Sequence, residues 1–228
     1  MTSTARGAAF SDVDETLIRV KSMFRFLEFH LRLRGEPPAT YERLTGELRQ
    51  AALRGVPRDE INRHYYRLLR GESASRLAAA GRRWFAAEWE EQKDGLYLPD
   101  VEEALLAHRK GGRALILVSG SFFAPLDPIA ADIGAEAVLA TRPVIRRGEL
   151  TGEVLAPMIG ETKGRAVRLA APIAGLDLAA SWAYGDHSSD LSMLRAVGHP
   201  VVVGDDPELA FHATTAGWAR LTAGPVRR

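Results

Sequence analysis

The fold of this chain is decided by the stretch Ala8–Leu17, which reads AAFSDVDETL. A short apolar segment with strand character ends in two carboxylates, Asp12 and Asp14, which are two residues apart. Because residues i and i+2 of a strand point to the same side, both carboxylates are expected to project past the edge of a sheet. Parallel α/β folds place their chemistry at that edge. The stretch therefore predicts the first strand of such a sheet, with a site at its end.

The Asp12–Asp14 pair has two interpretations. Two like charges this close raise the pKa of one carboxyl group unless a cation lies between them. The pair therefore indicates either a nucleophile beside a proton carrier or a site for a divalent metal ion. The alternative is structural, because Asp-rich turns commonly do no more than cap a helix.

The segment between Leu17 and Tyr97 has helical periodicity and no strand pattern. Glycine, proline and serine residues divide it into four expected helices, which begin with a cap at Ser22, near Ala39, at Pro57 and with a cap at Ser73 or Ser75. The aromatic residues Tyr65, Tyr66, Trp84, Phe85 and Trp89 lie at helical spacings and are expected in the interior of these helices. The pattern predicts an all-helical insertion of roughly 75 residues after the first strand.

From Pro99 onward, strand patterns alternate with helical ones. Helices are expected at Pro99–Lys110, after Ser121 as far as Ile133, at Glu161–Ala170, after Asp190 and at Asp206–Gly217. Strands are expected at Ala114–Val118, Ala137–Ala140, Trp182–Tyr184 and Pro200–Val203. Val144–Leu155 is expected to form a hairpin outside this repeat. The alternation predicts the α/β class, with a doubly wound, Rossmann-like parallel sheet and right-handed crossovers.

Composition narrows the functional classes. The 228 residues are 46% hydrophobic and 26% charged, which is typical of a globular protein. The absence of cysteine excludes disulfides, thiolate metal sites and cysteine catalysis. No apolar run approaches the roughly 18 residues that span a bilayer, and Met1–Gly7 is too short and polar for a signal peptide, so we expect a cytoplasmic protein without a membrane partner.

The net charge of +1 argues against a nucleic-acid partner, but the charge is unevenly distributed. Between Leu17 and Leu98 there are 16 basic residues and 11 acidic ones, a net of +5, which leaves −4 for the rest of the chain. A basic insertion facing an acidic core would attract an anionic substrate. A solvated helical surface is the alternative.

Polar residues also follow the later strands and their helices. Ser119 and Gly120 come after the strand at Ala114–Val118, and Asp186 and Asp190 come after Trp182–Tyr184. Carboxylates gathered at strand ends without a His or Cys cluster suit a hard cation, and Mg2+ is the default. The Ser-Gly turn offers a hydroxyl and N–H groups to a phosphate, and Lys163 adds a positive charge near a helix start. Together these residues predict phosphoryl transfer with an aspartate attacking phosphorus.

Four segments, Asp12–Leu17, Val118–Gly120, Lys163–Gly164 and Gly185–Asp190, resemble the four motifs of the haloacid dehalogenase (HAD) superfamily. The helical insertion is similar to the type I cap of its phosphoserine phosphatase-like subclass. The resemblance implies a HAD-like core made of residues 1–18 and 97–228, and a cap domain made of residues 19–96.

The resemblance also implies catalytic roles. Asp12 would be the nucleophile that forms an aspartyl-phosphate, and it would ligate Mg2+. Asp14 would protonate the leaving alcohol and then deprotonate the hydrolytic water, while its backbone carbonyl would ligate the metal. Lys163 would neutralise the nucleophile and the transferred phosphoryl group.

The remaining motif residues would bind phosphate and metal. Ser119 and the Gly120 N–H would bind phosphate oxygens. Asp186 would ligate Mg2+ directly, and Asp190 would complete the metal site through a water molecule or would hold Lys163.

Three residues depart from the phosphoserine enzymes. Glu15 replaces a Gly or Ser, Ser189 replaces an Asn, and Lys21 stands where those enzymes have a glutamate that pairs with the substrate's amino group. As a substrate-binding residue, Lys21 would repel an ammonium and favour a carboxylate, phosphate or polyol oxygen; the alternative is that it extends into solvent. The substrate is therefore expected to be a small phosphorylated metabolite other than phosphoserine.

His187 is expected either to contact the substrate or, as the simpler interpretation, to lie on a surface loop. Arg58, Arg63 and Arg67 are expected either at a pocket mouth or, as the simpler interpretation, on an exposed helical face. The sequence thus predicts a Mg2+-dependent phosphomonoesterase. The alternatives are a phosphotransferase that uses an alcohol acceptor and a non-catalytic HAD-like binding protein. A dehalogenase is disfavoured, because displacement of halide requires neither Asp14 nor a metal.

Overall fold

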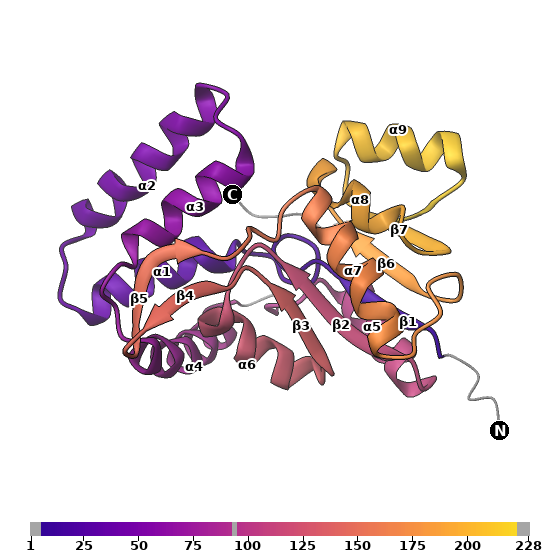
Figure 1. Cartoon of the computed structure of the whole chain (residues 1–228), viewed down its shortest axis with the longest axis horizontal. Coiled ribbons are helices and arrows are strands. Elements are labelled where there is room, and N and C mark those ends of the chain that lie inside the picture. Colours follow the sequence, from indigo (N-terminus) through magenta and orange to yellow (C-terminus); the bar gives the residue numbers. More distant parts are fainter. Residues whose placement is uncertain (1–5, 93–94, 223–228) are drawn as a thin grey trace.

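The computed structural model describes residues 6–92 and 95–222 (Figure 1). Its centre is a six-stranded sheet with the strand order β3-β2-β1-β6-β7-β8, in which all neighbouring strands are parallel. The strands are β1 Ala8–Ser11, β2 Ala114–Ser119, β3 Ala137–Ala140, β6 Trp182–Gly185, β7 His199–Val203 and β8 Ala219–Leu221. The order runs outward from β1 in both directions, which confirms the predicted doubly wound sheet. The short edge strand β8 was not predicted.

Helices cover both faces of the sheet, as the apolar run in β2 predicts. Every residue of β2 is buried. Leu115 and Leu117 join one hydrophobic cluster with α5 and α6, whereas Ile116 and Val118 join a second cluster with α7, α8 and α9. These helices are α5 Pro99–Lys110, α6 Phe123–Ile133, α7 Glu161–Ile173, α8 Leu191–Leu194 and α9 Pro207–Ala216. The carboxyl ends of the parallel strands therefore lie at one edge of a sheet that is packed between two layers of helices.

The predicted helical insertion is confirmed. It contains α1 Ser22–Leu33, α2 Pro38–Leu53, α3 Arg58–Leu68 and α4 Ala74–Glu91. Ser73 caps α4 as expected, because its hydroxyl accepts a hydrogen bond from the Arg76 N–H at 3.4 Å. The cap expected at Ser22 is wrong: Lys21 occupies the N-cap position, and the buried Ser22 hydroxyl instead donates to Ser121 Oγ at 3.0 Å. In residues 6–92 and 95–222, no helix combines the length and apolarity that a membrane crossing requires.

The insertion is attached to the core by a hairpin outside the main sheet. Strands β4 Pro143–Arg146 and β5 Glu149–Val154 form the predicted hairpin. Three backbone hydrogen bonds join it to the turn between α3 and α4: Gly71 N to Leu150 O at 2.8 Å, Leu150 N to Glu72 O at 2.9 Å, and Ala74 N to Gly148 O at 2.9 Å. Figure 1 shows the hairpin beside α3, so the insertion rests on the core on this side as well as along α4 and α6.

The contact between α4 and α6 depends on Gly81. A Cβ atom built at Gly81 would lie 1.8 Å from the carbonyl oxygen of Ala124, so the two helices must separate to accept a side chain. We expect Gly81→Ala to lower the free energy of unfolding by about 2 kcal/mol, as overpacking does. Gly46→Ala is the matched control: this residue is also inside a helix but faces open space, so the same change should stabilise the protein by about 1 kcal/mol. Urea denaturation measures both, and equal effects would contradict the packing argument.

Candidate active site

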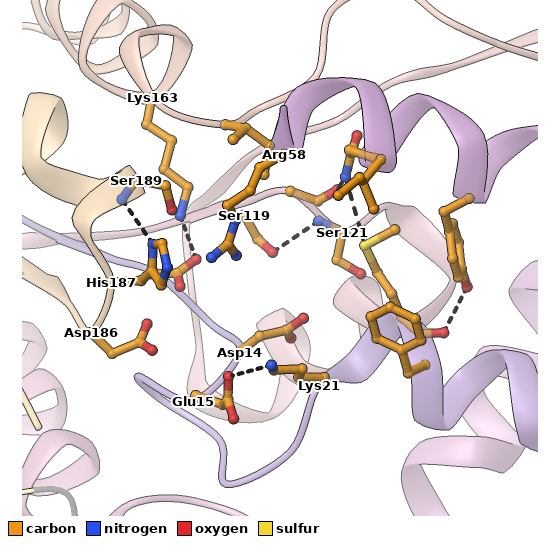
Figure 2. A pocket seen from close by; sticks show the side chains of 18 of the residues that line it. Asp14, Glu15, Lys21, Arg58, Ser119, Ser121, Lys163, Asp186, His187 and Ser189 are labelled. Atoms are coloured by element: carbon orange, nitrogen blue, oxygen red, sulfur yellow. Dashed lines mark hydrogen bonds and ion pairs between the residues drawn. The ribbon is translucent and has the colours of Figure 1, made fainter. Parts of the chain in front are cut away.

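A cavity of ≈ 390 Å³ lies between the carboxyl ends of the strands and the helical insertion (Figure 2). The core contributes Asp12, Asp14, Glu15, Ser119, Gly120, Ser121, Ile159, Lys163, Asp186, His187 and Ser189 to its wall. The insertion contributes Lys21, Met23, Phe24, Leu48, Ala52, Arg58, Ile61, Asn62 and Tyr65. The structure therefore brings every predicted site residue except Asp190 to the surface of one cavity, and Asp190 lies directly behind it.

Lys163 joins two of the predicted carboxylates. Its Nζ atom lies 2.7 Å from Asp12 Oδ1 and 2.5 Å from Asp190 Oδ1, and the lysine is 2% exposed. The three residues come from different elements, since Asp12 follows β1, Lys163 lies in the first turn of α7 and Asp190 closes the loop after β6. Burial alone would lower the pKa of Lys163, but the charges of Asp12 and Asp190 raise it overall. The lysine is therefore a fixed positive charge next to Asp12.

The loop after β6 holds Asp190 in place. Asp190 Oδ2 accepts a hydrogen bond from the His187 N–H at 3.3 Å, and the Asp190 N–H donates to His187 O at 2.7 Å. The Ser189 N–H donates to His187 Nδ1 at 3.0 Å. Gly185 is required by this turn, because a Cβ atom there would lie 2.6 Å from Asp190 Cβ. Both carboxylate oxygens of Asp190 are thus already engaged by protein donors.

Asp12, Asp186 and Asp190 form an acidic cluster in which one carboxylate oxygen of each residue lies within 4.8 Å of the others. Burial, with the neighbouring acidic charges, raises the pKa of Asp12 to about 6 and that of Asp186 to about 8, although Lys163 opposes both shifts. Thr16 Oγ1 donates to Asp186 Oδ1 at 2.8 Å and orients this carboxyl group. The single positive charge of Lys163 does not neutralise the three carboxylates of this cluster. An all-oxygen, acid-rich site of this kind fits a hard divalent cation such as Mg2+.

Asp14 projects into the same cavity without a direct contact to Lys163. Its Oδ1 atom is buried and has no hydrogen-bond partner among the described residues. Burial, together with the charge of Asp12, raises the pKa of Asp14 to about 7. This carboxyl group can therefore hold or release a proton near neutral pH.

The turn after β2 is bound by side chains of the insertion. The Ser119 hydroxyl accepts a hydrogen bond from the Ser121 N–H at 3.1 Å, and Gly120 O accepts one from Asn62 Nδ2 at 2.9 Å and one from the Tyr66 hydroxyl at 3.1 Å. A Cβ atom at Gly120 would lie 2.6 Å from Ile159 Cδ1, so a side chain at this position would require the end of the Ile159 side chain to move. Asn62 was not predicted as a site residue, because its partner is a carbonyl far away in the sequence.

Glu15 and Lys21 form an ion pair on the cavity wall. Lys21 Nζ lies 3.1 Å from Glu15 Oε2, and Figure 2 shows the pair below Asp14. Glu15 adopts a φ of 62°, a left-handed conformation that glycine adopts at lower cost. The Glu15 carboxylate, which the phosphoserine enzymes lack at this position, therefore points toward Lys21. Lys21 thus lines the cavity as part of an ion pair, although its side chain is 56% exposed to solvent.

Arg58 and His187 lie at the site, whereas their simpler interpretations placed both on the surface. Both line the cavity, and His187 is half-buried. Figure 2 shows Arg58 pointing from α3 toward His187. Burial lowers the pKa of His187, and the positive charge of Arg58 lowers it further. Helical periodicity alone does not reveal which side of α3 faces the strand ends.

The aromatic residues of the insertion divide into two groups. Tyr65, Tyr66 and Trp84 are buried, as predicted. Trp89 is 51% exposed, so its predicted interior position is wrong. It packs at the end of α4 against Phe85 and Tyr97, which cover only part of its side chain.

Comparison with known proteins identifies the family. A family model described as haloacid dehalogenase-like hydrolase matches residues 9–195. A probable phosphatase of Mycobacterium tuberculosis is 30% identical over 226 residues, which cover 96% of this chain and 76% of the relative. A solved structure of a protein with unknown function from Bordetella pertussis Tohama I is 27% identical and has a TM-score of 0.82, covering 96% of this chain and 99% of that one. A substrate-bound phosphoserine phosphatase shares the fold, with a TM-score of 0.65 and 21% identity over 92% of this chain and 91% of its own. The chain belongs to the family of haloacid dehalogenase-like hydrolases.

Proposed function

We propose that this hydrolase is a Mg2+-dependent phosphomonoesterase that cleaves a small phosphorylated metabolite through an aspartyl-phosphate on Asp12. The family match and the relatives named as phosphatases support a phosphatase of the HAD type. The observation that carries the proposal is the Lys163 bridge, which holds Asp12 at a cavity wall beside a second carboxyl group, Asp14, with a pKa of about 7.

Asp12 and Asp14 divide the reaction between them. A carboxylate oxygen of Asp12 attacks phosphorus, and the bond between phosphorus and the alcohol oxygen breaks. Asp14 gives its proton to the departing oxygen, so the alcohol leaves neutral. In the second half, Asp14 takes a proton from the water that attacks the aspartyl-phosphate, which releases inorganic phosphate and restores Asp12.

The surrounding residues would bind the negatively charged phosphoryl group as it is transferred. Ser119 and the Gly120 N–H would bind phosphate oxygens, and Lys163 would neutralise the nucleophile. Arg58, which enters from α3, adds a second cation at the same end of the cavity. Asp12, Asp186 and the Asp14 carbonyl would hold Mg2+, which supplies Lewis-acid neutralisation of the phosphoryl oxygens. Asp190 would complete that site indirectly, because its oxygens hold Lys163 and the loop after β6.

Residues 19–96 would act as a cap domain on a core made of residues 1–18 and 97–228. Nine residues of this segment line the cavity, and only Lys21 of them precedes α1. Closing these helices over the strand ends would exclude bulk water while Asp12 carries the phosphoryl group.

Phosphate release from a generic aryl phosphate, with and without Mg2+, tests the proposal. We expect turnover only with the metal. A transfer product on addition of alcohols would instead identify a phosphotransferase. Metal binding without turnover across a broad phosphate panel would contradict the proposal and favour a non-catalytic binding protein.

The metal assignment has a test that does not depend on activity. At a Mg2+ concentration of about 100 times Kd, binding should stabilise the native state by about 2.7 kcal/mol, which corresponds to roughly 5–10 °C in Tm. Asp186→Asn should remove most of this shift and lower kcat by on the order of 10²-fold or more. The exposed Asp205 provides the control, since Asp205→Asn should keep the full shift. A normal Mg2+ shift in Asp186→Asn would rule Asp186 out as a ligand.

A further inference from the structure

The cavity has two chemically different sides. The core side carries the carboxylates, Lys163 and the Ser-Gly turn. The insertion side is mostly apolar, with Met23 and Phe24 from α1, Leu48 and Ala52 from α2, and Ile61 from α3. Apart from Arg58, the groups that the phosphate chemistry needs lie on the first side. The second side is left to contact whatever the phosphate is attached to.

The uncharged polar side chains on the insertion side, Asn62 and Tyr65, already form hydrogen bonds within the protein. Asn62 Nδ2 donates to Gly120 O at 2.9 Å and lies 3.8 Å from Met23 Sδ, while Asn62 Oδ1 accepts from Thr141 Oγ1 at 3.4 Å. The Tyr65 hydroxyl donates to Met23 O at 2.7 Å. These two side chains therefore keep little hydrogen-bonding capacity for a polar substrate group.

The charged groups also disfavour an amino alcohol. Lys21 is paired with Glu15, and in the part of the chain that the structure describes no carboxylate of the insertion lines the cavity. Arg58 is a cation at the phosphate end, beside His187. An ammonium group on the alcohol would meet Lys21 and Arg58, and it would find no carboxylate among the insertion residues that line the cavity, so its desolvation would be poorly compensated on that side.

We propose that the site takes phosphomonoesters whose alcohol carries an apolar body, alkyl or aromatic, and no ammonium group. The apolar body packs against Met23, Phe24, Leu48, Ala52 and Ile61, and the phosphate sits among the core residues. This inference rests on the proposed phosphomonoesterase function and names its substrate class. A cavity of ≈ 390 Å³ is near the lower end of the roughly 300–1,000 Å³ found for small-molecule sites, so the body is short.

A series of straight-chain alkyl phosphates from ethyl to hexyl tests the proposal, because their leaving alcohols are chemically alike and differ only in apolar length. We expect kcat/KM to rise by roughly threefold to fourfold per methylene until the cavity is filled. Phosphoethanolamine and ω-hydroxyalkyl phosphates of matched length should fall well below the alkyl compounds. Normal hydrolysis without dependence on chain length, or a preference for the polar compounds, would overturn the substrate class. Failure to hydrolyse any phosphomonoester would instead overturn the proposed function.

Variants on the apolar side locate the effect. Ile61→Asn should reduce the ratio of kcat/KM for hexyl phosphate to that for ethyl phosphate by about tenfold, the effect of losing apolar contact in a pocket. Ala52→Asn changes an exposed residue and serves if Ile61→Asn does not fold. Leu53→Asn is the matched control, because Leu53 lies on the same helix as Ala52, is 80% exposed and does not line the cavity. An equal change in the Leu53→Asn ratio would show that the apolar wall does not select the substrate.

Discussion

Asp12→Asn lowers kcat for phosphomonoester hydrolysis by on the order of 10⁴-fold or more, because the carboxylate that would form the covalent intermediate is gone. An amide oxygen is a poor nucleophile toward phosphorus, and the other residues of the cavity cannot replace it. The fold should survive. The substitution keeps the shape of the side chain and leaves Asp190 as a partner of Lys163. It also removes a buried carboxyl group whose pKa is raised to about 6, so that no buried negative charge remains at this position.

Two measurements separate chemistry from folding in this variant. Circular dichroism and thermal unfolding should show a native protein, while phosphate release from an aryl phosphate falls to background. Asp100→Asn is the control, since Asp100 is exposed in the first turn of α5 and should retain full activity. Full activity in Asp12→Asn would show that the nucleophile assignment is wrong.

Local sequence patterns were sufficient to predict five of the six strands of the sheet and the motif loops that follow them. The apolar run of β2 is buried on both faces because parallel strands lie between two helical layers. The carboxyl ends of parallel strands share one edge, so Asp12, Ser119 and Asp186 had to meet once the strands were assigned. The side chain of Lys163 could be placed beside them because its helix begins at the same edge.

Features that depend on an unusual backbone conformation, or on a partner far away in the sequence, could not be predicted. Glu15, which pairs with Lys21, has a left-handed backbone conformation that nothing in the sequence signals at a glutamate. The hydrogen bond from Asn62 to Gly120 depends on how α3 docks over the strand ends. The Ser22 hydroxyl finds Ser121 for the same reason, and so it does not act as the expected helix cap.

Small elements were also beyond the sequence patterns. The strand β8 has three residues, too few for an alternating pattern to be recognised. Its parallel pairing with β7 is seen only in the structure. The division of α3 into a cavity side and a solvent side likewise needs the neighbouring helices, and this division places Arg58 at the site.

Lys163→Met should be the most destabilising change at the site. Removing the ammonium group leaves Asp12 and Asp190 facing each other in a buried environment, with no positive charge between them. Breaking a buried ion pair by removing one partner typically costs about 3–5 kcal/mol, and we expect a loss of this size in urea denaturation without Mg2+. Activity should fall as well, because neither the nucleophile nor the phosphoryl group is then neutralised by the side chain. Lys110→Met, at an exposed lysine, should change the free energy of unfolding by less than about 0.5 kcal/mol.

A double variant distinguishes charge repulsion from lost packing. In Lys163→Met/Asp190→Asn, only one buried carboxylate remains in the former bridge, so part of the lost stability should return. The amide oxygen that Asp190→Asn introduces can still accept the hydrogen bond that the His187 N–H now gives to Asp190 Oδ2. The two single effects should therefore add up to more than the double effect by about 1–3 kcal/mol, the range seen for residues in direct contact. Additive effects would mean that Lys163 stabilises the site by packing alone. The ion pairs of Lys163 with Asp12 and Asp190 would then contribute nothing measurable to stability, which would contradict the argument that they fix Asp12 for attack.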